Sequence, residues 1–225
     1  MFYKCNSLKE INISSFNTTK VTKMKYLFNG CKLLKKIIGI SNLVSENVEE
    51  IQYFFCDCSS LEEICSLGWN TKSVKYLNSS FKGCHSLRYI KGIGSWNTSN
   101  ITEMEASFKN CYSLEDLSDI SKWDVSKVIT TKGLFYGCVK LKTLLISHWK
   151  FYNLKDCSFM FAGCDKLNDN SILIILNNDA NFNEIFKNCF ALMPNGRPLF
   201  DIYDKNEDKK KMDIKKAILK KKKPK

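Results

Sequence analysis

The chain has 225 residues, which allows one domain or at most two small ones. With 44% hydrophobic and 26% charged residues it can bury a core, so a wholly disordered protein is not expected. No run reaches the roughly 18 apolar residues of a membrane span, and no secretory signal is visible at the start. The net charge of +12 and the 11 cysteines are the two features that need explanation.

Eight of the cysteines recur at steps of 25 to 27 residues. Each has a phenylalanine three residues before it and a leucine three residues after it, so F-x-x-C-x-x-L occurs eight times in register. A fixed period of this length is typical of repeat proteins whose units stack on one another. The ladder cysteines are Cys5, Cys31, Cys58, Cys84, Cys111, Cys138, Cys164 and Cys189, and the ladder phenylalanines are Phe2, Phe28, Phe55, Phe81, Phe108, Phe135, Phe161 and Phe186.

Upstream of six of the eight motifs, a large apolar residue marks a recurring place that we call the Trp position. In the unit 96–122, Ile101, Met104 and Phe108 follow the spacing of one face of a short helix, which predicts a helix over 98–108 with a Ser or Thr cap. From the second repeat on, the residue before the ladder cysteine is Gly, Asn or Asp, which tolerates positive φ and favours a left-handed end to that helix. The Trp position holds Phe16, Leu43, Trp69, Trp96, Trp123 and Trp149.

After each ladder cysteine, the pattern L-x-x-[IL] predicts a short strand with its apolar side chains inward. These elements together predict an α/β solenoid, a leucine-rich-repeat-like curved stack of about eight coils of 25–27 residues. Short parallel strands would lie on one face of the stack and short helices on the other. We expect the repeats in 1–167, a degenerate C-terminal repeat and cap in 168–203, and a disordered lysine-rich tail in 204–225.

The repeats resemble a known family. Segments such as WNTSNITEMEASFKNCYSLEDL and WDVSKVITTKGLFYGCVKLKTL look like BspA-like leucine-rich repeats. That family includes the repeat of about 25 residues first noted in mycoplasma surface lipoproteins. The resemblance covers 1–167 well and 168–192 loosely. It implies a non-enzymatic protein-binding surface, often on the outside of a cell, and brings no catalytic residues with it.

The ladder cysteines allow two interpretations. Adjacent coils would place their Cα atoms about 5 Å apart, within disulfide range, so a stack of disulfides or a row of metal ligands is one. The other, which we favour, is a small buried thiol at the turn into each strand, because no histidine accompanies the row and zinc sites favour closely paired ligands. We expect no cofactor and no metal, including at Cys56 and Cys58, a lone C-x-C.

Localisation stays open at this point. The odd cysteine total favours reduced thiols and an intracellular environment, whereas the family resemblance implies the cell surface. The chain starts within a repeat, and a missing N-terminal portion with a signal would remove this conflict.

The two residues between the leucine and isoleucine of each strand form the expected binding face. The first of them alternates in charge along the stack, which predicts the pairs Lys35–Glu62, Glu62–Arg88, Arg88–Glu115 and Glu115–Lys142 across neighbouring strands. The same residues also form a mixed-charge recognition surface with Tyr89 as an anchor. The predicted binding face is Lys35, Lys36, Glu62, Glu63, Arg88, Tyr89, Glu115, Asp116 and Lys142.

More than half of the net charge lies in the tail, where residues 204–225 hold 11 lysines and 4 acids. A solvated tail is the simpler interpretation, with nuclear targeting, nucleic acid or an anionic membrane as alternatives. The tail residues that would provide such contacts are Lys220, Lys221, Lys222 and Lys223.

Enzyme signatures do not occur in the sequence. The two histidines, His85 and His148, lie in separate repeats, and there is no Gly-rich phosphate loop, H-E-x-x-H or G-x-S-x-G. The sequence therefore predicts a monomeric, non-enzymatic module, used in surface adhesion or recognition, that binds a protein through the sheet face. The alternative is an intracellular or nuclear scaffold anchored to nucleic acid or an anionic membrane through its tail.

Overall fold

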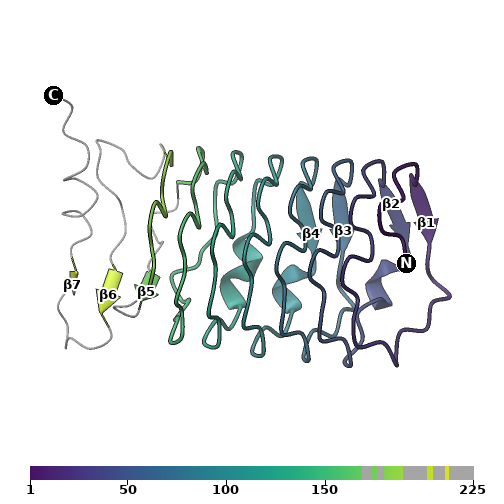
Figure 1. Ribbon diagram of the computed structural model, residues 1–225, viewed down its shortest axis with the longest axis horizontal. Helices are drawn as coiled ribbons and strands as arrows, with labels where there is room; N and C mark the ends of the chain where they lie inside the picture. The colour runs from purple at the N-terminus through teal and green to yellow at the C-terminus, as the bar shows by residue number, and fades with distance from the viewer. Residues whose placement is uncertain (169–173, 177–179, 190–201, 205–210, 213–225) are drawn as a thin grey trace.

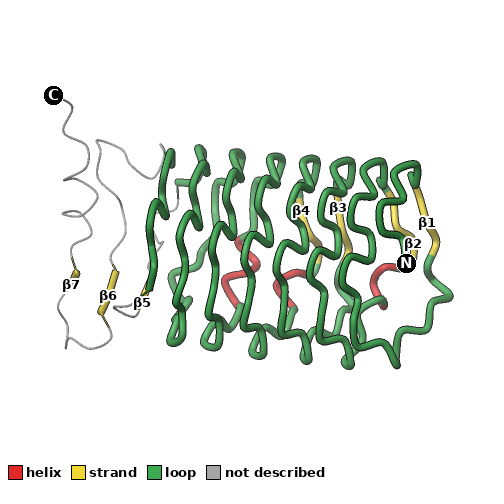
Figure 2. Tube along the Cα trace, in the orientation of Figure 1, coloured by secondary structure: helices red, strands yellow, loops and turns green. Residues whose placement is uncertain are grey.

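The computed structural model describes residues 1–168, 174–176, 180–189, 202–204 and 211–212. The chain winds into coils that stack side by side along the long axis of the molecule (Figure 1). Equivalent residues of successive repeats therefore form rows that run along the stack. These rows organise the molecule more than its regular elements do, because most of each coil is turn or loop (Figure 2).

Short parallel strands lie at the first four sites where the L-x-x-[IL] pattern occurs. At the next two sites the chain forms only a single parallel bridge, between Asp116 and Thr143. Their register aligns equivalent positions of neighbouring repeats, so that Ile64 lies opposite Ile90. The strands are β1 (Glu10–Asn12), which pairs with β2 (Lys36–Ile38), and β3 (Glu63–Cys65), which pairs with β4 (Tyr89–Lys91).

Three more strands are described near the C-terminus. Strand β5 (Ile174–Leu176) pairs in parallel with β6 (Ile202–Asp204), and β6 pairs antiparallel with β7 (Lys211–Met212). Strands β5 and β6 fall in or at the end of the expected cap, and β7 falls in the expected disordered tail. The rest of 169–225, apart from 180–189, lies outside the described residues.

A second row of parallel contacts runs through the segment predicted to be helical. The N–H of Phe81 donates to Ser107 O at 2.8 Å, and that of Phe108 donates to Leu134 O at 2.9 Å. An α-helix would use these donors within its own turns. The predicted helix over 98–108 is therefore wrong, and the described residues contain no α-helix. The bridging residues of this row are Lys23, Glu50, Tyr76, Glu103, Thr130, Asp156 and Asn181.

Two left-handed residues in each coil explain why this segment is not a helix, since helical residues need negative φ. One precedes the ladder cysteine, as predicted, and Asn110 at φ 61° is an example. The other lies two residues before the ladder phenylalanine, where Ala106 has φ 54°. The expected cap is also used differently, because the Thr98 hydroxyl donates to Asp124 O of the following coil at 3.0 Å.

Stacked aromatic rows fill the core. Each ladder phenylalanine stacks on the next, with ring centroids 5.1 to 5.8 Å apart. The four tryptophans stack likewise, at 5.4 to 6.3 Å. Buried indole N–H groups find partners in the preceding coil, as Trp123 does with Ile93 O at 3.0 Å. Each such ring pair contributes about 0.5–1.5 kcal/mol beyond its buried area.

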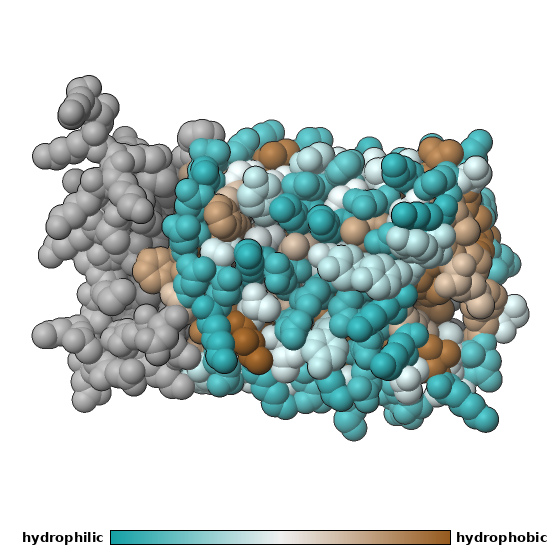
Figure 3. Space-filling view, in the orientation of Figure 1, coloured by the Kyte–Doolittle hydropathy of each residue, from teal (hydrophilic) through white to brown (hydrophobic). Residues whose placement is uncertain are grey.

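The first coil shows how far burial depends on neighbours. Phe2 and Leu8 are only partly buried, whereas their counterparts Phe28 and Leu34 in the next coil are fully buried. Apolar surface gathers at this end of the stack (Figure 3). A coil therefore buries its inward residues only when another coil covers them.

The one-residue differences in repeat length have a local cause. Measured between ladder cysteines, the longest repeats have 27 residues, and each of these contains a 3₁₀ helix. The stretch from Ile90 to Trp96 is one residue longer than the equivalent stretch from Ile64 to Trp69. The 3₁₀ helices absorb the additional residue at this place, and in the described part of the chain they are η1 (Ile40–Asn42), η2 (Ile93–Ser95) and η3 (Ser118–Lys122).

Two of these helices interrupt the sheet. Gly39 and Gly92, with φ of 81° and 88°, follow β2 and β4 and turn the chain into η1 and η2. At the equivalent place after β3, Ser66 N–H instead donates to Lys91 O at 2.8 Å and extends the pairing. Within residues 1–168, no strand pairing joins β2 to β3 or β4 to the following coil. From β1 to β4 the coils thus pair two by two on this face. The next three coils bond in succession, with Asp116 bridged to Thr143 and the Asn168 N–H donating to Lys142 O at 3.2 Å.

The left-handed turn after β4 generates a stability prediction. A Cβ at Gly92 would lie 2.8 Å from the Leu67 backbone, in addition to the left-handed φ. We expect Gly92→Ala to lower the free energy of unfolding by about 2–4 kcal/mol, measured by urea denaturation.

Gly133→Ala is the matched control for this change. Gly133 is also left-handed, but a Cβ there would meet only Tyr136 Cβ at 3.6 Å, and Ala106 already occupies the same row one coil earlier. We expect a loss of about 1 kcal/mol. Equal losses for the two variants would contradict the close approach at Gly92.

Candidate functional site

All nine residues of the predicted binding face are exposed. They lie on β2, β3 and β4, at the residue just before each of these strands, and on the two coils that follow. Their apolar neighbours point inward, so that Ile64 and Ile90 are buried. The structure thus brings these nine residues together on the strand side of the stack.

The predicted charge ladder forms only in part. Glu62–Arg88 and Glu115–Lys142 have closest charged atoms 3.9 and 2.9 Å apart, and Lys142 holds the pKa of the Glu115 carboxyl below its usual value. Within residues 1–168, the predicted Lys35–Glu62 and Arg88–Glu115 contacts do not come within 4.0 Å. The two missing pairs would span the junctions where the sheet is interrupted. Charge alternation therefore produces ion pairs only between coils whose strands pair.

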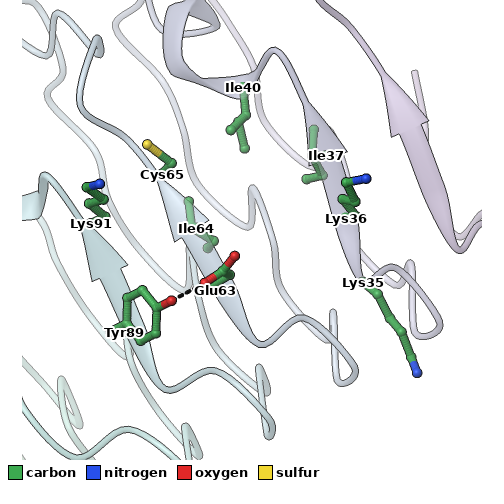
Figure 4. Close-up of a pocket in the computed structure, with 9 residues that line it drawn as sticks. All are labelled: Lys35, Lys36, Ile37, Ile40, Glu63, Ile64, Cys65, Tyr89 and Lys91. Carbon is green, nitrogen blue, oxygen red and sulfur yellow. Dashed lines mark hydrogen bonds between the residues drawn. The ribbon is translucent and has the colours of Figure 1, made fainter.

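Tyr89 lies between two hollows in this face. Its side chain is half-exposed, and its hydroxyl donates to a Glu63 carboxylate oxygen on β3 (Figure 4). This hydrogen bond raises the pKa of Tyr89, because a phenolate beside the carboxylate would be disfavoured. The contact holds the ring across the strand pair β3–β4.

The first hollow has a volume of about 330 Å³ and opens between β2 and β3 (Figure 4). Its apolar floor includes Ile37, Ile40 and Ile64, and Cys65 lies beside them. This is the junction at which η1 replaces strand pairing. Its rim residues are Lys35, Lys36, Glu63, Tyr89 and Lys91.

The second hollow has a volume of about 490 Å³ and opens between β4 and the following coil, next to η2. Arg88 and Tyr89 line one side of it, and Glu115, Asp116 and Asp119 line the other. Sequence reasoning found the exposed strand residues but missed Cys65, Lys91 and Asp119. The signal that could have found them is a 27-residue repeat with a glycine two residues after the strand isoleucine, at Gly39 and Gly92. The third 27-residue coil, which contains Asp116, lacks this glycine and pairs with the following coil.

The ladder cysteines lie at the turn into each strand, and all are buried except the half-buried Cys5. From the second coil on, each S–H donates to the ladder phenylalanine carbonyl of the preceding coil, as Cys84 does to Phe55 O at 3.1 Å. Burial raises the pKa of Cys138 to about 12. Burial raises the pKa of each ladder thiol from Cys31 to Cys164, so these thiols are protonated donors at neutral pH and link one coil to the next.

The remaining cysteines do not gather into a ligand set. Cys56, in the lone C-x-C, is buried with its pKa raised by burial to about 12, and Cys157 is buried with a pKa raised to the same value. All eleven cysteines carry free thiols. Among the described residues, no group of three or more His, Cys, Asp or Glu side chains is arranged to hold a metal ion.

Two further features bear on binding. His85 stacks on Tyr112 of the next coil with ring centroids 4.7 Å apart, so it belongs to a surface aromatic row. The tail residues Lys220, Lys221, Lys222 and Lys223 lie outside the described residues. No helix in the described part of the chain is long and apolar enough to cross a membrane.

The buried thiols predict a pH dependence of stability. The pKa values of Cys56, Cys138 and Cys157 are raised to about 12 in the folded protein, against an ordinary value of about 8.5. Their stabilising effect is complete below pH 8.5 and is lost as the pH rises toward 12, because unfolding lets the thiols ionise. For each of these three thiols, the free energy of unfolding should fall by about 1.4 kcal/mol for every pH unit above 9.

Urea denaturation between pH 7.5 and 10 measures this effect. We expect a nearly constant unfolding free energy up to pH 8 and a steep fall above 9. Cys138→Ala should make that fall shallower by about one thiol's contribution. The same slope in both proteins would show that Cys138 ionises as easily in the folded state as in the unfolded chain.

Comparison with known proteins gives one informative match. No curated protein matches the chain. Two solved structures are similar to this chain. The first is a leucine-rich cell surface protein from Faecalibacterium prausnitzii A2-165, with 15% sequence identity and a TM-score of 0.34; the match covers 92% of this chain and 75% of that protein. The second is a leucine-rich repeat protein from Bacteroides ovatus ATCC 8483, with 18% identity and a TM-score of 0.30; the match covers 84% of this chain and 67% of that protein. At these TM-scores neither likeness bears on the fold. The family model described as "Mycoplasma protein of unknown function, DUF285" matches residues 1–91 and 77–196, and the chain therefore belongs to this family.

Proposed function

We propose that this protein is a monomeric, non-enzymatic interaction module, used in adhesion or recognition at a cell surface, that binds a protein partner through its sheet face. The observation that supports the proposal most directly is the placement of Tyr89, an exposed aromatic side chain flanked by two hollows. Tyrosines beside such hollows are typical anchors of protein interfaces. The likeness of the repeats to BspA-like leucine-rich repeats supports the same assignment.

The charges of the two hollows differ in sign. At the first hollow three lysines, Lys35, Lys36 and Lys91, outnumber one acid, Glu63. At the second hollow three acids, Glu115, Asp116 and Asp119, outnumber Arg88 and Lys91. A partner segment lying along the stack would match this face if it carried an acidic group near β2 and a basic group beyond β4. Such complementarity raises association rates and rejects wrong partners more than it adds affinity.

A binding experiment with matched tyrosine variants tests the proposal. The tagged full chain would capture surface proteins from candidate cells, and the affinity of the purified partner would be measured by calorimetry. We expect Tyr89→Ala to weaken binding at least 10-fold, which corresponds to about 1.4 kcal/mol. Tyr3→Ala, equally exposed but in the first coil and off this face, should change it less than 2-fold. Unchanged affinity in Tyr89→Ala would refute the proposed site.

The lysine-rich tail favours a second candidate function, a scaffold anchored to nucleic acid or anionic lipid. Residues 204–225 carry 11 lysines and 4 acids, whereas the binding face mixes both signs. Such anchoring predicts affinity for duplex DNA or phosphatidylserine vesicles that falls steeply with salt. It also predicts loss of that affinity when Lys220–Lys223 are replaced by glutamine. Salt-insensitive binding would contradict this candidate.

A further inference from the structure

We infer that a hollow on the turn edge of the stack, away from the sheet face, binds a neutral saccharide. The hollow has a volume of about 510 Å³ and lies among the turns of the coils that contain Tyr112, Tyr136 and Gly163. Its size falls within the range of about 300–1,000 Å³ that is typical of small-molecule sites. The inference goes beyond the proposed protein-binding function and rests on other residues.

Two tyrosine rings present open faces to this hollow. The N-terminal side of Tyr112 is covered by His85, which stacks on it at 4.7 Å, and that of Tyr136 is covered by Lys109, whose Nζ lies 4.5 Å from the ring centroid. Both partners come from the preceding coil, so the opposite faces point toward the next coil. Each tyrosine side chain is more than one-third exposed.

The hollow exists because, in each of the two rows that contain these tyrosines, the side chain in the next coil is smaller. The row that contains His85 and Tyr112 continues with Val139, and the row that contains Lys109 and Tyr136 continues with Ala162. Short side chains at these two positions cannot cover the rings beside them. The hollow is also deeper at Gly163, the left-handed residue before the ladder cysteine Cys164, because glycine carries no side chain.

Polar groups of both signs surround the aromatic faces. Asn110 and Asn188 contribute amides, and Asp165 contributes a carboxylate. Lys187 also lines the hollow, but its ammonium is paired with Glu184 at 2.9 Å. The Asn110 amide is directed over Gly137, since its Oδ1 lies 2.6 Å from the place of a Cβ there. The rim therefore offers hydrogen-bond donors and acceptors without a concentrated charge.

These groups together match the chemistry of a pyranose. A sugar ring has an apolar C–H face that packs on an aromatic ring, and hydroxyls at its edge that bond to amides and carboxylates. A phosphate or other anion would need several unpaired cations, whereas the one lysine here is neutralised. A purely apolar ligand would leave the amides and the carboxylate unsatisfied.

Saturation-transfer NMR and calorimetry on the full chain test the inference, with maltotriose, cellotriose, chitotriose and lactose as probes. We expect transfer to the ring C–H protons of at least one probe. Tyr112→Ala and Tyr136→Ala should each weaken its binding at least 10-fold, and Tyr112→Phe should stay within about 3-fold. The control Tyr26→Ala removes a similarly exposed tyrosine from a different row and should change binding less than 2-fold.

Val139→Tyr provides a test that removes no contact of the folded protein. The new ring would continue the His85–Tyr112 stack and fill the hollow, so we expect binding to be lost while urea denaturation shows a folded protein. No transfer to any of the four probes, or binding that persists in Val139→Tyr, would overturn the inference. Binding lost in Tyr89→Ala but retained in Tyr112→Ala would also overturn it, since the saccharide would then occupy the sheet face.

Discussion

The structure depends on contacts between one coil and the next. Turns within a coil satisfy part of its backbone N–H groups, but the other N–H groups and the apolar side chains need the neighbouring coil, so each row continues across the junction. The row of ladder residues shows this most clearly: the Cys111 S–H donates to Phe81 O at 3.1 Å, while Phe81 stacks on Phe108 at 5.3 Å. From the second repeat on, a small buried donor recurs beside a large buried ring because each coil must fit the one before it.

The hollows that we propose as binding sites arise where this regularity changes. A repeat one residue longer inserts a 3₁₀ helix after the strand, and the left-handed Gly39 and Gly92 then end the pairing with the following coil. The sheet opens at these junctions into hollows on both sides of Tyr89. On the turn edge, a change of residue size has a similar effect, because Val139 and Ala162 leave two tyrosine faces uncovered. Small local changes thus produce concave sites in an otherwise uniform stack.

The helix prediction failed for an identifiable reason. The spacing of Ile101, Met104 and Phe108 suits one face of a helix, but it suits equally a chain that turns twice and places the same residues inward. The left-handed residue before the cysteine was visible in the sequence as Gly, Asn or Asp. The second left-handed residue was not, because Tyr26, Ser79 or Ala106 at that position carries no such signature.

The sequence by itself determined the repeat, the inward residues, the strands after the first four ladder cysteines and the exposure of the proposed binding face, because these follow from a period that recurs along the repeats. Only the tertiary structure decided that backbone donors bond to the next coil rather than within a helix, since both arrangements bury the same side chains. It also decided which charges pair and where hollows form. Those outcomes depend on whether neighbouring strands hydrogen-bond, and the left-handed turns at Gly39 and Gly92 end that contact with the next coil.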